Sequence, residues 1–109
     1  MKTFVYGFGP YEEFDANISE SIVSALAPEP GVVVEVFDVR FDRDMFFRVL
    51  GRHAPDVVIG LGQCRRGRKL RIEGRAQNLW GRRGEPLRRV SESGPGHLFA
   101  SLRLPLDAR

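Results

Sequence analysis

The sequence predicts an α/β fold: a three-layer α/β/α arrangement around a mostly parallel sheet, in a single domain over residues 1–109. Residues 3–8, 32–37 and 56–62 are rich in β-branched, aromatic and aliphatic side chains, which favour buried strands. Amphipathic helical patterns lie between these runs. Strands that alternate with helices in this way form right-handed crossovers and pair in parallel.

The first strand is expected to end in the tight loop that Gly9 and Pro10 indicate. Asp15 or Asn17 can cap the helix that follows, which runs to about Leu26. Its apolar face is defined by helical spacing and contains Ile18, Ile22, Val23 and Leu26. The stretch 27–31, which contains two prolines and a glycine, ends this helix.

The second helix is predicted after the strand at 32–37, with Asp42 or Asp44 as its cap and an end near His53. Its apolar stripe consists of Met45, Phe46, Val49 and Leu50. The third strand, at 56–62, is apolar almost throughout, as expected for the centre of a parallel sheet. Beyond it the pattern weakens: we expect a strand near 69–78, a long loop over 81–96 and a further element at 97–104.

Ligands of doubly wound sheets bind beyond the carboxyl ends of the strands, which here places residues 7–14, 39–42 and 60–66 at a candidate site. The first of these loops lacks the Gly-x-Gly-x-x-Gly pattern, and the chain has no Walker A motif, so a nucleotide site is not favoured. No cofactor is expected. Metal binding is not expected either, because Cys64, His53 and His97 show no ligand spacing.

Charge is divided unevenly along the chain. Residues 1–64 carry five basic and ten acidic side chains, net −5, and residues 65–109 carry twelve basic and four acidic ones, net +8. The second half could attract phosphates, which leaves open a non-catalytic, Arg-rich module that binds an acidic partner or nucleic acid. Only Trp80 lies among the arginines, so a solvated basic surface is the favoured interpretation and nucleic acid an unlikely partner.

No apolar run approaches the roughly 18 residues that a membrane helix needs, and the short apolar N-terminus does not resemble a signal peptide. A single cysteine cannot form an internal disulfide, which predicts the reducing cytoplasm as the location.

Five short motifs occur in order. Residues 7–11 read Gly-Phe-Gly-Pro-Tyr and 17–19 read Asn-Ile-Ser; 55–63 read Pro-Asp-Val-Val-Ile-Gly-Leu-Gly-Gln, 71–78 read Arg-Ile-Glu-Gly-Arg-Ala-Gln-Asn, and 93–102 read Ser-Gly-Pro-Gly-His-Leu-Phe-Ala-Ser-Leu. Together they resemble pyroglutamyl peptidase I, a family of phosphorylase/hydrolase-like fold. The resemblance covers nearly the whole chain, but only about the first half of a typical member.

The resemblance implies a cysteine peptidase that removes N-terminal pyroglutamate from peptides, through a Cys-His-Glu arrangement. It implies that Glu73, ten residues after Gln63, is the carboxylate that orients the histidine. It also implies that Phe8 and Tyr11 line the pocket for the pyrrolidone ring, with Gln63 beside it. Aromatic faces would bury the methylenes of the lactam, while polar groups would satisfy its N–H and C=O.

The nucleophilic Cys and the His of the family lie in its C-terminal half, which these 109 residues do not contain. We therefore expect a truncated, inactive fragment or degenerate relative. Cys64 with His53 or His97 as base is a weaker alternative, because Cys64 does not match the family's nucleophile position. Half of a sheet also leaves an unpaired strand edge and bare apolar faces, which predicts marginal stability or self-association.

Overall fold

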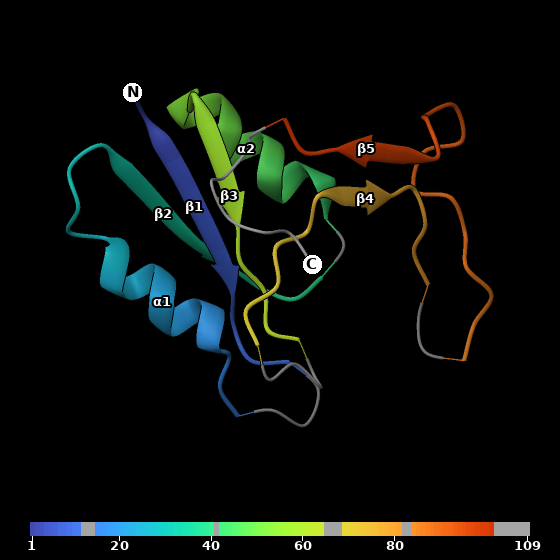
Figure 1. The fold of residues 1–109 in the computed structure, drawn as a ribbon, viewed down its shortest axis with the longest axis horizontal. Helices are drawn as coiled ribbons and strands as arrows, with labels where there is room; N and C mark the ends of the chain where they lie inside the picture. Colours follow the sequence, from blue (N-terminus) through green and yellow to red (C-terminus); the bar gives the residue numbers. More distant parts are fainter. Residues whose placement is uncertain (12–14, 41, 65–68, 82–83, 102–109) are drawn as a thin grey trace. The chain divides into compact units, whose positions relative to one another are not determined.

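The computed structural model of the protein describes residues 1–11, 15–40, 42–64, 69–81 and 84–101. The chain divides into two compact units, Met1–Gly67 and Arg68–Arg109. The elements, labelled in Figure 1, are β1 (Thr3–Phe8), α1 (Ile18–Leu26), β2 (Val32–Phe37), α2 (Arg43–His53), β3 (Val57–Gly60), β4 (Arg75–Gln77) and β5 (His97–Phe99).

In the first unit, a three-stranded parallel sheet has the order β2-β1-β3. Thr3 pairs with Val32 on one side and with Val57 on the other. The central strand is therefore β1, and the expectation that the third strand lies at the centre is wrong for the described residues. Among the described residues β3 lies at the edge of this sheet, and its Val58 and Ile59 are partly exposed.

Helix α1 covers one face of this sheet, and its close seating depends on a glycine. A Cβ at Gly7 would lie 2.7 Å from the backbone oxygen of Ser19 and 2.9 Å from Cγ2 of Val23. Val23 is fully buried in this layer. Only a residue without a side chain therefore lets β1 and α1 approach so closely.

Helix α2 covers the opposite face through an aromatic core. Phe4 and Phe37 are buried with Val49 of the helix, and Phe46 packs against them. The ring centroids of Phe37 and Phe46 are 4.6 Å apart, and those of Tyr6 and Phe46 are 5.2 Å apart. Side chains alternate between the two faces along β1, so helix, sheet and helix form the three layers that the sequence predicts.

Both helices begin where the sequence places a cap. Asn17 accepts from the backbone N of Ser19, and Asp42 accepts from the backbone N of Asp44 and of Met45. These bonds satisfy amide donors that the first helical turn leaves unpaired. Helix α2 ends at Ala54, which has a left-handed φ of 43°, before Pro55.

The second unit is a small antiparallel structure. β4 pairs with β5, and an isolated bridge joins Trp80 to Arg88, which lies within the loop predicted over 81–96. Asn78 holds this loop closed, because its side chain donates to the carbonyl of Ser91 at 2.7 Å and accepts from the Ser91 amide at 2.8 Å. No described residue of this unit is buried, which distinguishes it from the first.

The strand expected near 69–78 is thus shorter than predicted, and β5 occupies part of the element expected at 97–104. The end of that predicted element, residues 102–104, and several of the arginines, Arg65, Arg66, Arg68, Arg82 and Arg83, lie outside the described residues.

Candidate functional site

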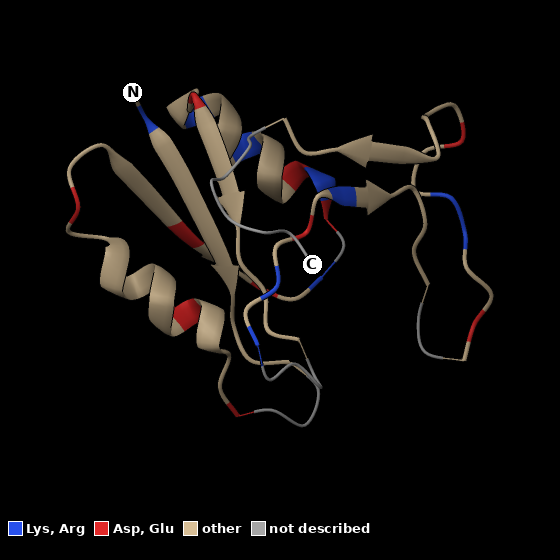
Figure 2. Cartoon of the chain, viewed as in Figure 1, with Lys and Arg blue, Asp and Glu red and all other residues tan. Residues whose placement is uncertain are grey.

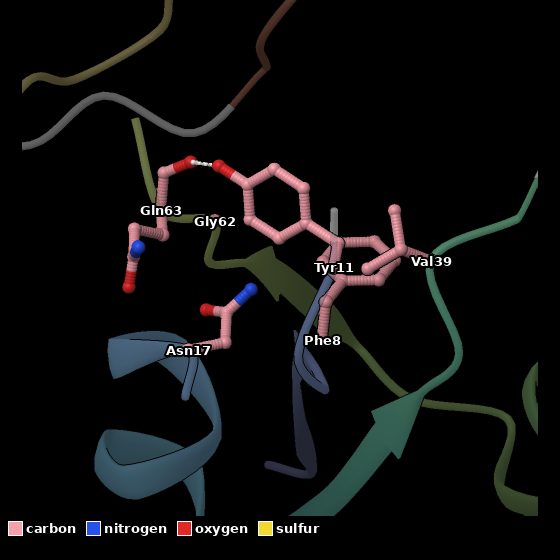
Figure 3. A pocket seen from close by; sticks show the side chains of 6 residues that line it. All are labelled: Phe8, Tyr11, Asn17, Val39, Gly62 and Gln63. Atoms are coloured by element: carbon pink, nitrogen blue, oxygen red, sulfur yellow. Dashed lines mark hydrogen bonds between the residues drawn. The ribbon is translucent and has the colours of Figure 1, made fainter. Parts of the chain in front are cut away.

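A cavity of about 260 Å³ lies at the carboxyl end of the three-stranded sheet, where the loops after β1, β2 and β3 meet. Its lining residues, all in the first unit, are Phe8, Tyr11, Asn17, Val39, Gly62 and Gln63. Figure 3 shows the polar side chains of Asn17 and Gln63 on one side of the cavity, and the rings of Phe8 and Tyr11 with Val39 on the other. The lining therefore combines an apolar wall with a polar one.

The start of α1 is fastened to the end of β1 by a buried hydrogen-bond network. The Asn17 side chain donates to the carbonyl of Gly9 at 3.1 Å, and its Oδ1 accepts from the Ser19 hydroxyl at 2.6 Å. The Ser19 hydroxyl oxygen also accepts from the backbone N of Phe8 at 3.0 Å. Asn17 and Ser19 are only 3% and 1% exposed, so this network rigidly fixes one wall of the cavity.

Gln63 connects the loop after β3 to two other parts of the site. Its Oε1 accepts from the backbone N of Ile18 at 2.8 Å, and its backbone carbonyl accepts from the Tyr11 hydroxyl at 3.1 Å. The first bond fixes which end of the amide carries the donors, because an oxygen must face the Ile18 N–H. The Nε2 donors of Gln63 have no hydrogen-bond partner among the described residues, so they are available to a ligand.

The structure brings together three of the four site residues that the sequence suggests. Phe8, Tyr11 and Gln63 line one cavity although they lie up to 55 positions apart in the sequence. They meet there because Phe8 ends β1 and Gln63 follows β3. Asn17, Val39 and Gly62 also line the cavity and are not among the site residues that the sequence suggests. Their signal was present: Asn17 belongs to the second motif, and Val39 and Gly62 fall within loops expected at the carboxyl ends of the strands.

Glu73, the fourth of these residues, belongs to the second unit. Its carboxylate forms an ion pair with Arg71 at 2.7 Å, and both side chains are more than half exposed. An exposed pair of this kind contributes little to stability. The role of Glu73 in catalysis stays a prediction.

The cysteine and the two histidines of the alternative nucleophile–base pair lie in different parts of the chain. Cys64 is a free, exposed cysteine, His53 ends α2, and His97 lies in β5. Across the part of the chain that the structure describes, no three His, Cys, Asp or Glu side chains are grouped so that they could hold a metal ion. Nor does this part contain a helix long and apolar enough to cross a membrane.

Comparisons with known proteins place this arrangement among solved structures. No family model matches the sequence, and no curated protein matches it. The pyroglutamyl peptidase I structure from Bacillus amyloliquefaciens is 27% identical, with a TM-score of 0.79 over 93% of this chain and 55% of its own. A point mutant of pyrrolidone carboxyl peptidase from Pyrococcus furiosus is 24% identical, with a TM-score of 0.82 over 94% of this chain and 55% of its own.

The chain thus spans about half the length of the solved structures it matches. Its parallel sheet with helices agrees with the fold that the resemblance implies. The chain has the α/β fold of pyroglutamyl peptidase I, over a span that corresponds to the N-terminal half of those enzymes.

Proposed function

We propose that the chain provides the pyroglutamyl-binding half of a pyroglutamyl-peptidase-type hydrolase. The observation that supports this most is the cavity itself: Phe8, Tyr11 and Gln63, selected by resemblance, line one space together with the buried cap Asn17. Its volume of about 260 Å³ is small for a drug-sized ligand but suits a five-membered lactam with the start of a peptide chain.

The chemistry of the lining matches a lactam. The rings of Phe8 and Tyr11 offer apolar faces to the ring methylenes. The Nε2 of Gln63 can donate to the lactam carbonyl while its Oε1 keeps the bond to Ile18. A proline ring has the same shape but lacks this carbonyl, so the hydrogen bond would distinguish a pyroglutamyl from a prolyl terminus.

Cleavage needs more than this pocket. In the proposed reaction a histidine takes the proton of a thiol, and the thiolate attacks the carbonyl carbon of the bond that joins pyroglutamate to the peptide. The histidine gives the proton to the departing amine, and water then hydrolyses the thioester to release pyroglutamate. A carboxylate orients the imidazole throughout. Glu73 is the proposed carboxylate, by resemblance. Cys64 and the two histidines do not occupy the family's positions, so we expect these 109 residues to bind pyroglutamyl peptides without hydrolysing them. The cytoplasm is the proposed location, because the sequence contains a single cysteine.

Calorimetric titration with pyroglutamyl-alanine amide tests the binding proposal. Substitution Gln63→Glu keeps the oxygen that accepts from Ile18 but replaces the Nε2 donors with a carboxylate oxygen, which would face the lactam carbonyl. We expect affinity to fall at least about tenfold, because a lost hydrogen bond of this kind costs about 1.5 kcal/mol. Gln77→Glu, the same change on exposed β4, serves as the matched control and is expected to bind normally.

Prolyl-alanine amide provides the second arm of this titration and should bind more weakly than the pyroglutamyl ligand. Equal affinity for the two amides, or an unchanged affinity in Gln63→Glu, would contradict the proposed pocket.

A fluorogenic pyroglutamyl amide tests for hydrolysis separately. Hydrolysis by the purified chain that is lost in Cys64→Ser would show that Cys64 is a nucleophile after all.

A further inference from the structure

The position of Gln63 depends on bonds that this residue makes itself. β3 separates from β1 at Leu61, whose amide donates to the carbonyl of Tyr6 at 2.8 Å, the last backbone bond between these strands among the described residues. Gly62 follows without a side chain, and a Cβ added there would meet no described atom within 4 Å. Gly62 therefore gives no support through side-chain packing to Gln63, which is half-buried and lines the cavity.

Tyr11 supplies one of these bonds from the loop after β1. Its hydroxyl donates to the backbone carbonyl of Gln63 at 3.1 Å, across 52 positions of sequence. Figure 3 shows the ring of Tyr11 along the apolar side of the cavity, with its hydroxyl end directed at that carbonyl. The two parts of this side chain thus have different tasks: the ring lines the cavity, and the hydroxyl fastens the loop after β3 to the loop after β1.

The second bond holds the other end of the same residue. The Oε1 atom of Gln63 accepts from the backbone N of Ile18 at 2.8 Å, at the start of α1. A glutamine fixed only through its amide could shift with its loop, and one fixed only through its backbone could rotate its side chain. Because Gln63 is held at both ends, its amide has few orientations open to it, and Nε2 needs no reordering before it donates to a ligand.

We propose that the Tyr11 hydroxyl is a positioning group for recognition of the pyrrolidone carbonyl. This inference rests on the proposed function, in which Nε2 of Gln63 donates to that carbonyl. The hydroxyl acts through Gln63 and not by contact with the ligand ring. A ring that lacks the carbonyl should therefore bind with the same affinity with or without the hydroxyl, whereas a pyroglutamyl ring should bind more weakly without it.

The variant Tyr11→Phe tests this role, because it removes the hydroxyl and keeps the aromatic face. In calorimetric titration of the whole chain we expect its affinity for pyroglutamyl-alanine amide to fall at least about threefold, toward that of Gln63→Glu, since a neutral hydrogen bond is lost. Its affinity for prolyl-alanine amide should equal that of the wild type. Tyr6→Phe is the matched control: the chain's other tyrosine packs in the core and does not line the cavity, so its hydroxyl should affect neither affinity.

A double-mutant cycle and amide exchange separate positioning from general destabilisation. In the Gln63→Glu background, Tyr11→Phe should cost no further affinity for the pyroglutamyl amide, because the donor that the hydroxyl positions is already absent. Without ligand, the amide of Ile18 reports the bond to Oε1, since the first amides of a helix have no acceptor within the helix. We expect this amide to exchange faster in Tyr11→Phe than in the wild type, while the amides of β1 and β2 keep their protection.

The outcomes distinguish this inference from the function on which it rests. A wild type that binds the two amides equally would refute the proposed function, and the role of Tyr11 in recognition with it. Where the wild type discriminates between them, the positioning role alone is overturned by an unchanged or higher pyroglutamyl affinity in Tyr11→Phe, by an equal loss for both amides, or by a loss that adds fully to that of Gln63→Glu. Unchanged exchange at Ile18 would likewise show that the hydroxyl does not hold Gln63 in place.

Discussion

Tyr6 shows how much one side chain contributes to the packing of the first unit. Its ring contacts Phe4, Phe8, Phe37 and Phe46 on the α2 face of β1. The ring also covers Gly60, where an added Cβ would clash with it. Burial raises the pKa of the Tyr6 hydroxyl above its usual value, because the phenolate would lose hydration there.

A raised folded-state pKa predicts a loss of stability at alkaline pH. The contribution of Tyr6 is fully present below the unfolded pKa of about 10 and is lost as the pH rises through the higher folded pKa. Urea unfolding at increasing pH should show the free energy of unfolding of the wild type falling more steeply above about pH 10 than that of Tyr6→Phe. Parallel profiles for the two proteins would show that Tyr6 does not titrate differently on folding.

At the scale of elements, the contact between β1 and α1 controls the geometry of the cavity. Gly7→Ala would place a methyl group against the backbone of Ser19 and the side chain of Val23, neither of which can yield without moving the helix. We expect a loss of about 1–3 kcal/mol in the free energy of unfolding by urea denaturation. Because Ser19 and Asn17 form one network, weaker pyroglutamyl binding should accompany it.

Gly9→Ala is the natural control for this substitution. Its Cβ would find the nearest atoms at 3.8 and 3.9 Å, which is ordinary van der Waals distance. We expect the stability of Gly9→Ala to remain within about 0.5 kcal/mol of the wild type. If the two alanine variants were equally stable, α1 would not be seated as closely as the structure indicates.

The sequence predicts elements better than it predicts their pairing. The bounds of β1, β2 and both helices agree closely with expectation, because Asn17 and Asp42 are local capping signals and the strand composition is strongly biased. The position of β3 at the sheet edge could not be predicted, since strand order depends on contacts between distant residues. Of the residues that line the cavity, the motifs identified Phe8, Tyr11 and Gln63. Val39 belongs to no motif, and it lines the cavity because β2 ends beside β1.

At the scale of the whole molecule, the two units differ in net charge. Figure 2 shows acidic residues on the elements of the first unit together with basic residues on α2, and residues of both signs along the described part of the second. The first unit carries seven basic and ten acidic side chains, net −3, and the second carries ten and four, net +6. One of these arginines, Arg88, lies over the ring of Trp80 at 5.7 Å, so that ring is not a free stacking surface for bases.

This arrangement predicts weak, purely electrostatic binding to nucleic acid. We expect labelled duplex DNA to bind the protein at low salt and to dissociate near physiological ionic strength. Nonspecific contacts release counterions, so their affinity depends steeply on salt. Fluorescence anisotropy across a salt series measures this directly. Tight binding that persists at physiological salt would instead favour the alternative of an Arg-rich nucleic-acid module.

The cavity takes every one of its walls from a contiguous part of the chain, residues 8–63, whereas Glu73 lies in the other unit. In the proposed function, one stretch of the chain thus provides the residues that surround the pyrrolidone ring, and the proposed orienting carboxylate comes from outside that stretch. Substitutions can therefore alter recognition of the ring and orientation of the histidine one at a time.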